Sequence, residues 1–581
     1  MKFVLAVLAV LFVLESPSPP ADSLDRIVAD CWQYQLDHQP AVRLQKGLPV
    51  QDLPEISAES DRKETAFYRG LLERLARIDP ASLEHGDWLT HAVLRWELEK
   101  AVEAADHLAV TAQITPYTFP LPSVHEIFTR HSFSSREDLD RYLRLLRQYP
   151  RYVGQIQARA EWQRTRGFLI PRETVDQMVP LIRAFAQPSE RSLFTVAPAR
   201  LESRLEQITP EQAKAFRAQV ARLVQAEVNP ALEKLASLLE GDYRKAAPDR
   251  VGLGQYPGGP EAYRFFVRQH TGLDVTPEEV HRRGLEEVAR IEARMAEIRR
   301  KVGFEGTQRQ FNDRLRSDPR FLAKTPEEVG ERLMAPVRRI EPLIGRYFLR
   351  TPKAPYGVKR LDPALEGSWT FGLYQQPSSA DPSGWYLFNG SRLDQRPLVG
   401  AAALIYHELL PGHHFQIALQ LENGSLPELR KILYHTAFVE GWGEYASELG
   451  IEMGLYDDPY ALYGRLAMDM FLSNRLVVDT GMNALGWPRP KAIAYMRDRL
   501  LESDVQIDTE TLRYATSIPG QALAYKMGSA KIWELRRRAE RELGSGFDLR
   551  RFHDAVLGSG SLPLSVLERH VDWWIGQQKR R

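Results

Sequence analysis

The sequence predicts a mostly α-helical protein, a large multi-helix body with two helical halves and one small β-sheet. Apolar residues recur three and four positions apart over most of the chain, which is typical of amphipathic helices. An aromatic, alternating segment between about residues 352 and 395 is the exception. The length of 581 residues is several times what a single core requires, so we expect two or more large subdomains.

The N-terminus has the form of a secretory signal peptide, assigned to residues 1–22. Lys2 precedes an apolar run from Phe3 to Leu14, which is too short to span a membrane. Prolines stand close to every candidate cleavage site, so the sequence does not place the cut. No cysteine directly follows the run, which argues against lipid modification, and the single cysteine, Cys31, excludes an intrachain disulfide. We expect an exported bacterial protein, periplasmic or secreted, without stable membrane insertion after signal removal.

The charges of the chain nearly cancel. Lys and Arg number 77 and Asp and Glu number 76, which gives a formal net charge of +1. This balance removes the electrostatic argument for nucleic acid or an acidic membrane as a partner. We therefore expect no nucleic-acid partner.

The two helical halves are predicted to meet near residue 250. Residues 23–246 read as one amphipathic helix after another, and a Gly/Pro-rich stretch then interrupts the pattern. In the second half, residues 247–581, a helix is expected to begin at Pro277. Thr276 is a good N-cap there and acidic residues fill the first turn.

Two strands are expected within residues 352–395. SWTFGLYQQ and GWYLFNGS are short aromatic runs, separated by PSSADPSG, which is typical of a loop. The sheet would lie directly before the helices that resume at about residue 397. Its edge could hold an extended substrate by backbone hydrogen bonds, or the sheet could only cover the core.

The segment YHELLPGHHFQ (residues 406–416) carries candidate metal ligands on an apolar, helical pattern. Satisfied core histidines are the structural alternative, but burying so many without a function is costly. On a regular helix His413 would point about 120° away from His407, and His414 would lie about 10 Å along the axis. The Pro-Gly pair between them permits an irregular turn, and a two-residue bulge would make His413 the second ligand.

A third ligand is expected from HTAFVEGWGEYASELG (residues 435–450). Glu440 and Glu444 are one turn apart, so either could face the histidines. Glu440 is preferred because the glycine after it would let a partner helix approach closely. Together with His407 and His413 it would hold one Zn²⁺ with an open fourth position, the catalytic form of a zinc site.

Glu408 is the candidate general base. With a metal in place it would deprotonate a water molecule and pass the proton to the leaving amine. The ligand set keeps two alternatives, since His414 could replace His413 and Glu444 could replace Glu440.

Five motifs together resemble the bacterial domain of unknown function 885 family: HELLPGHHFQ, FVEGWGEYASELG, RLVVDTGMNALGW, RYATSIPGQALAYKMG and FHDAVLGSGSLPLSVLE. The family pattern His-Glu-x-x-Pro-Gly-His-His falls on residues 407–414, and Glu-Gly-Trp falls on residues 440–442. The family is similar to helical gluzincin zinc metallopeptidases, in which a deep cleft lies between two mostly α-helical halves. The resemblance covers most of the mature chain and implies that fold, with the small sheet next to the metal-binding helix.

The chain departs from the family pattern at two positions. Asn483 stands where the family commonly has histidine, and Gly443 stands where alanine is common. An asparagine amide can still donate a hydrogen bond, so an orienting role could survive, whereas proton transfer could not. Asn483 is therefore not among the predicted site residues.

The resemblance also implies that a Tyr or His from a later helix stabilises the developing oxyanion. Tyr525 and His435 are the candidates, and we predict both as catalytic residues beside Glu408. His435 could instead be the hydrogen-bond partner of a metal ligand. Arg513 could bind the terminal carboxylate of a substrate, or pair with a structural acid such as Asp479.

The predicted function is that of a zinc-dependent metallohydrolase, a peptidase acting on short peptides. The alternatives are a metal-dependent amidase or esterase acting on non-peptide substrates, and a catalytically impaired peptide-binding protein. The expected partner is a peptide or a small amide. The sequence predicts neither cleavage specificity, nor endo- against exo-cleavage, nor an oligomeric state.

Overall fold

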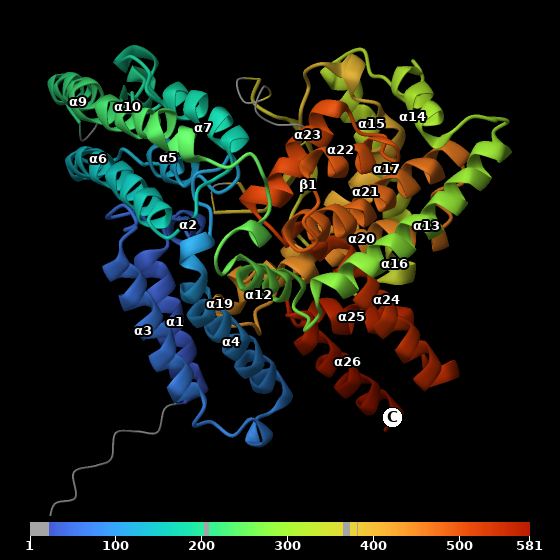
Figure 1. Cartoon of the computed structure of the whole chain (residues 1–581). Helices are drawn as coiled ribbons and strands as arrows, with labels where there is room; N and C mark the ends of the chain where they lie inside the picture. The colour runs from blue at the N-terminus through green and yellow to red at the C-terminus, as the bar shows by residue number, and fades with distance from the viewer. Residues whose placement is uncertain (1–22, 203–207, 364–365, 367–371, 380, 581) are drawn as a thin grey trace, which may run out of the picture.

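The computed structural model describes residues 23–202, 208–363, 366, 372–379 and 381–580 (Figure 1). The predicted signal peptide, residues 1–22, lies outside this part. The prediction of a mostly α-helical fold is confirmed. Among the described residues, no helix combines the length and apolar character that crossing a membrane requires.

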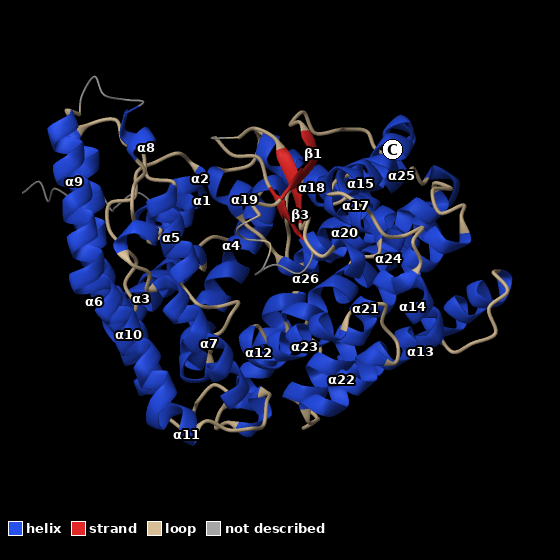
Figure 2. Cartoon of the chain, turned by 90° about the horizontal axis from the view of Figure 1, so that it is seen from above, coloured by secondary structure: helices blue, strands red, loops and turns tan. Residues whose placement is uncertain are grey.

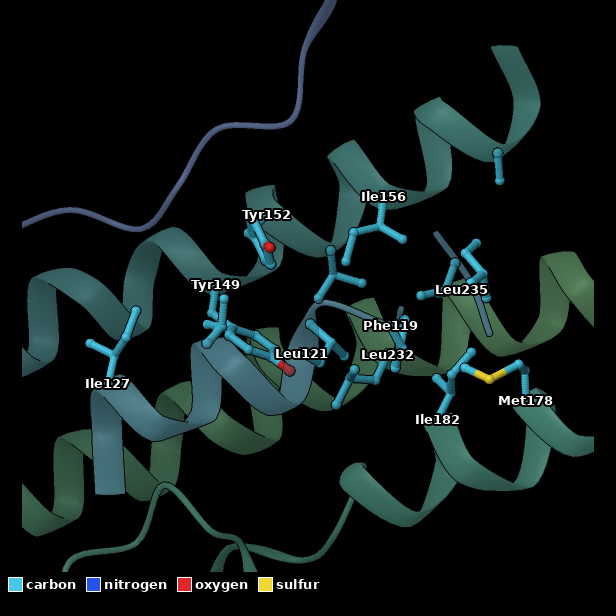
Figure 3. Packing of buried hydrophobic residues seen from close by; sticks show 14 of the residues in the cluster. Phe119, Leu121, Ile127, Tyr149, Tyr152, Ile156, Met178, Ile182, Leu232 and Leu235 are labelled. Atoms are coloured by element: carbon cyan, nitrogen blue, oxygen red, sulfur yellow. The ribbon is translucent and has the colours of Figure 1, made fainter. Parts of the chain in front are cut away.

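The N-terminal half is a set of helices around one large apolar core, with a smaller separate core among its first helices. Its helices are α1 (Leu24–His38), α2 (Pro40–Gln45), α3 (Ala58–Leu75), α4 (His85–Ala104), α5 (Leu121–Thr129), α6 (Arg136–Arg164), α7 (Arg172–Phe185), α8 (Pro198–Glu202), α9 (Pro210–Leu223), α10 (Asn229–Leu238) and α11 (Arg244–Ala246). Figure 3 shows the centre of the large core, where side chains of α5, α6, α7 and α10 interdigitate. The 3.6-residue apolar period of these segments therefore buries one face of each helix.

The C-terminal half contains the remaining helices. They are α12 (Gly259–Thr271), α13 (Pro277–Lys301), α14 (Gln308–Ser317), α15 (Pro326–Ile340), α16 (Ile344–Tyr347), α17 (Ala401–Glu408), α18 (His413–Glu422), α19 (Glu428–Ile432), α20 (Thr436–Glu452), α21 (Pro459–Asn483), α22 (Arg489–Arg497), α23 (Asp504–Leu512), α24 (Ala524–Leu543), α25 (Leu549–Gly558) and α26 (Leu564–Lys579). The predicted start of α13 is confirmed, because the Thr276 hydroxyl accepts from the Glu279 amide at 3.2 Å, and the Glu279 carboxylate accepts from the Thr276 amide at 2.8 Å.

The two halves share apolar cores. In Figure 1 the helices of the N-terminal half, blue to green, lie on one side, and α13 to α26 lie mainly on the other, while α19 lies against α1. Leu476, Leu523 and Met527 belong to the N-terminal core, and Leu89 and Val93 of α4 belong to the core around α17 and α20. The division at residue 246 and the deep cleft stay predictions.

The sheet has three strands: β1 (Tyr356–Arg360), β2 (Gly372–Gln375) and β3 (Gly384–Phe388). The order is β1-β3-β2, with β1 parallel to β3 and β2 antiparallel to β3. The two predicted strands are present as β2 and β3, although residues 367–371 lie outside the described part. Strand β1 was not predicted. Figure 2 shows the sheet beside α18, and β3 contacts that helix, which is where the sheet was expected.

Candidate metal centre

The His-Glu motif spans the junction of two helices. Helix α17 ends at Glu408, and α18 begins at His413. The prediction that no regular helix continues through this segment is confirmed, but the interruption is larger than the predicted two-residue bulge. A four-residue linker, residues 409–412, separates the two helices, because the proline at its third position cannot donate to the carbonyl one turn earlier.

Close packing fixes this linker. A Cβ on Gly412 would lie 1.8 Å from the carbonyl oxygen of His407, so only glycine fits there. The indole nitrogen of Trp442 donates to the carbonyl of Pro411 at 2.8 Å. Because Trp442 is on α20, the same contact ties the linker to the helix that carries the two candidate glutamates.

Helix α20 packs very closely against α24 at the glycine that follows Glu440. A Cβ on Gly441 would lie 2.4 Å from the backbone carbon of Gly528, and one on Gly528 would lie 1.9 Å from the carbonyl oxygen of Ala437. The two helices therefore touch through backbone. This is the close approach for which the glycine after Glu440 was expected.

The three predicted ligands converge. His407 Nε2 lies 3.6 Å from Glu440 Oε2, and His413 Nε2 lies 3.2 Å from the same oxygen. One ligand atom from each residue lies within 4.8 Å of the others, and all three side chains are buried. Within the described part of the chain, Glu440 Oε2 is buried without a well-aligned hydrogen bond. Atoms that point at one shared position rather than at each other fit a metal ion.

Glu444 occupies a different position from Glu440. Its Oε1 lies 2.8 Å from His407 Nδ1, the ring nitrogen that faces away from the cluster, and its Oε2 accepts from Arg465 at 2.8 Å. Burial lowers the pKa of His407, but the neighbouring carboxylates of Glu440 and Glu444 outweigh it and raise that pKa to about 10. A metal ion would compete with this proton at Nε2. This contact suits Glu444 to orient the His407 ring, and Glu444 is not part of the cluster of His407, His413 and Glu440.

His414 points away from the cluster. Its Nδ1 lies 3.0 Å from the hydroxyl of Tyr374 on β2, and its Nε2 lies 3.1 Å from the carbonyl oxygen of Ala354. Burial lowers the pKa of His414 to about 4, so the ring is neutral and both nitrogens are satisfied. His414 is a structural histidine between the sheet and α18.

Glu408 is half-buried and keeps an unengaged carboxylate. Among the described residues, none forms a hydrogen bond or ion pair with it. Burial raises its pKa, and the charges of Glu440 and Glu444 add to that rise, while His413 and His407 oppose it. A carboxylate that is adjacent to the histidines and free of partners can exchange a proton with a bound molecule.

Two tyrosines border the cluster. The ring of Tyr525, near the start of α24, stacks at 17° to the His407 ring with 6.2 Å between the centroids. Tyr434 was missed by the sequence analysis, and its hydroxyl donates to Glu440 Oε1 at 3.0 Å. It lines a small pocket of about 30 Å³ with Gln376, which follows β2, and Val439 of α20. The only sequence signal for Tyr434 is an aromatic residue just before a ligand-bearing helix.

His435 and Asn483 lie outside the cluster. His435 Nε2 lies 2.9 Å from Glu97 Oε1 of α4, and its Nδ1 lies 3.0 Å from the hydroxyl of Ser561. The ring therefore links the two halves. The Asn483 amide donates to the carbonyls of Asp479 and Tyr514 at 3.0 Å each, and its oxygen accepts from the backbone of Leu253 at 3.0 Å. These contacts are structural.

Arg513 does not form the pair with Asp479 that was one of its two predicted roles. It donates to Gln521 at 2.8 Å and to Glu510 at 3.4 Å. Asp479 instead accepts from the hydroxyl of Tyr263 at 2.6 Å and from the amide of Gly520 at 3.1 Å. Burial raises the pKa of Asp479 to about 7.

Comparison with known proteins agrees with this fold. No curated protein matches the chain. A crystal structure of a protein from Colwellia psychrerythraea, described as a putative lipoprotein, is similar over 95% of this chain and 99% of its own, with 26% identity and a TM-score of 0.87. A protein from Shewanella oneidensis, described as a putative lipoprotein of unknown function, has the same fold, with 17% identity and a TM-score of 0.74 over 94% and 99% of the two chains. A family profile described as bacterial protein of unknown function (DUF885) matches residues 40–571, so the chain belongs to the DUF885 family.

Proposed function

We propose that this protein is an exported zinc-dependent hydrolase that cleaves peptide bonds. The observation that carries the proposal is the convergence of ligand atoms of His407, His413 and Glu440 within 4.8 Å, beside the unengaged carboxylate of Glu408. A His/His/Glu set with an open fourth position is typical of catalytic zinc sites. The description of the two similar structures as lipoproteins supports export.

The side chains around the cluster suit hydrolysis. Zinc held there would supply Lewis-acid chemistry, which polarises a carbonyl and makes water acidic. Glu408 would take the proton of the attacking water and pass it to the nitrogen of the leaving amine. Burial and the charge of Glu440 raise the pKa of Tyr525 to about 12, so its hydroxyl keeps a proton to donate to the developing oxyanion.

The sheet supports a peptide as the substrate. Strand β2 is at one end of the strand order, and its Tyr374 ring lies 6.3 Å from the ring of His413. An extended peptide could add to this edge by backbone hydrogen bonds. The same arrangement would leave the substrate beside both the cluster and the pocket at Tyr434.

Zinc content is the first test. Wild type, His413→Ala and His414→Ala are purified and dialysed against the same buffer, and metal is measured by mass spectrometry. The two histidines are neighbours with different contacts, so His414→Ala is the matched control. We expect about one zinc per chain in wild type and in His414→Ala, and none in His413→Ala. A wild-type chain that takes up no zinc after reconstitution would refute the proposal.

Activity is tested with a peptide library beside acyl and aryl amides. The zinc-loaded wild type should cleave peptides, and Glu408→Gln should keep its zinc while losing at least a hundredfold in kcat, because general-base catalysis typically contributes 10²–10⁴-fold. Cleavage of the amides alone would favour the non-peptide alternative. Zinc binding without any turnover would favour a peptide-binding protein.

A further inference from the structure

A second group of charged side chains lies beside Tyr525. The guanidinium carbon of Arg475 is 4.8 Å from the centre of the Tyr525 ring, and that ring is 6.2 Å from the ring of His407. Arg475 is therefore within about 11 Å of His407, a span that roughly three extended residues cover. A group bound at Arg475 would be a short piece of peptide away from the metal centre.

This group carries more positive than negative charge. Arg475 and Arg513 share one carboxylate, that of Glu510, at 3.2 and 3.4 Å. Glu502 is the other carboxyl that acts on Arg475, and burial together with the charge of Glu510 raises its pKa to about 7. Near neutral pH the two carboxyl groups therefore do not fully balance the charges of Arg475 and Arg513. Buried guanidinium groups normally have a full set of carboxylate partners, so the surplus charge favours an anionic ligand.

Arg513 has an unused donor. Its Nε is buried and makes no hydrogen bond to any residue that the structure describes, although Nη1 and Nη2 bond to Glu510 and Gln521. The residue opens a single π-helical turn, η10 (Arg513–Ser517), a rare element that is frequent at functional sites. Leaving a buried donor unpaired is unfavourable, and a bound carboxylate would supply the missing partner.

The side chain of Arg513 contacts a partly exposed tyrosine of the N-terminal half. Tyr117, in the loop before α5, is 46% exposed, and its ring lies 5.0 Å from the guanidinium of Arg513. The Arg513 side chain itself is 14% exposed. Arg513 thus lies between Tyr117 of the N-terminal half and the pair of Arg475 and Tyr525 beside the metal centre.

We infer that Arg513, supported by Arg475, binds the C-terminal carboxylate of a peptide, and that the protein releases a short fragment of a few residues from peptide C-termini. The inference rests on the proposed peptidase function. The planar guanidinium suits bidentate binding of a carboxylate, and a second carboxylate opposite two arginines would balance the charge. The span of up to about 11 Å from Arg475 to His407 limits that fragment to a few residues.

Binding without turnover tests this assignment. Zinc-loaded Glu408→Gln is titrated by calorimetry with acetyl-trialanine and with acetyl-trialanine amide. We expect the acid to bind at least tenfold more tightly than the amide, and this preference to disappear in Glu408→Gln/Arg513→Gln. Arg536→Gln in the same background is the control. Arg536 is a largely buried arginine too, but its partners are Glu452 and Glu540, and it lies about three turns along α24 from Tyr525. The control should keep the preference.

The outcomes separate the two proposals. Equal affinity for acid and amide, including no binding of either, overturns the carboxylate site, whatever wild type cleaves. A preference that survives Arg513→Gln also overturns it, since the carboxylate would then be held by the metal. If Arg513→Gln does not fold, Arg513→Lys is measured instead. Lysine keeps the positive charge but cannot bind a carboxylate with two parallel N–H groups, so an unchanged preference for the acid would refute the site. A wild type that binds the acid through Arg513 but cleaves no peptide refutes only the peptidase.

Discussion

Replacing Glu444 by glutamine should weaken zinc binding while leaving every predicted ligand in place. The Glu444 carboxylate lies 2.8 Å from His407 Nδ1, and both side chains are at least 96% buried. A buried hydrogen bond to a charged group contributes about 1.5–3 kcal/mol. Since about 1.4 kcal/mol is tenfold in an equilibrium constant, we expect the zinc affinity to fall by about 10- to 100-fold.

The measurement is a competition titration with a chromophoric chelator at constant pH. Glu448→Gln is the matched control, because Glu448 is one turn further along α20 and accepts instead from the indole nitrogen of Trp533 at 2.8 Å. It should bind zinc as wild type does. Equal zinc affinities for Glu444→Gln and Glu448→Gln would refute the orienting role.

The same substitution should also destabilise the fold. Arg465 is fully buried and pairs with Glu444 at 2.8 Å, so Glu444→Gln weakens its charge compensation. Breaking a buried pair commonly costs about 3–5 kcal/mol, although the retained amide oxygen can still accept from Arg465. A urea titration of the metal-free proteins separates this loss from the loss in zinc affinity.

Three further outcomes are expected. Gly441→Ala should lower the free energy of unfolding by about 1–3 kcal/mol in urea titration, because its Cβ meets backbone of α24 at 2.4 Å, whereas Gly576→Ala, where no atom lies within 4 Å, should be neutral or stabilising. Tyr434→Phe removes the hydrogen bond to Glu440 Oε1 and should weaken zinc binding in the chelator assay by at most about tenfold, since this side chain is 51% exposed. Burial raises the pKa of Asp479 from 3.8 to about 7, so the folded state binds more protons than the unfolded state between these values. The contribution of Asp479 to stability should therefore fall as pH rises from about 4 to 7, and Asp479→Asn should remove that slope in melts over this range.

The residue types of the candidate site and most of the helices could be predicted without the folded structure. Helical periodicity depends on neighbours three and four residues away, so it is readable without tertiary structure. The proline and glycine before His413 also act locally, and they predicted an interrupted helix. The capping pattern at Thr276 predicted the start of α13 for the same reason.

Tertiary contacts decided which side chains meet. His413 and His414 are adjacent, and only the residue at which α18 starts after the linker directs one toward Glu440 and the other toward the sheet. Glu440 and Glu444 are one turn apart and both reach His407, but only the folded chain places Glu440 at Nε2 together with His413 and Glu444 at Nδ1. Strand β1 pairs in parallel with β3, although more than twenty residues separate them in the chain. A local sequence pattern cannot predict such a distant partner.

The partners of His435 show the same limit. Glu97 and Ser561 are far from it in sequence, so the local pattern around His435 could not distinguish a link between the halves from a group at the metal centre. Sequence patterns specify chemistry and local conformation, because both depend on near neighbours. The direction in which each side chain points depends on packing between distant segments, and only the folded chain supplies that packing.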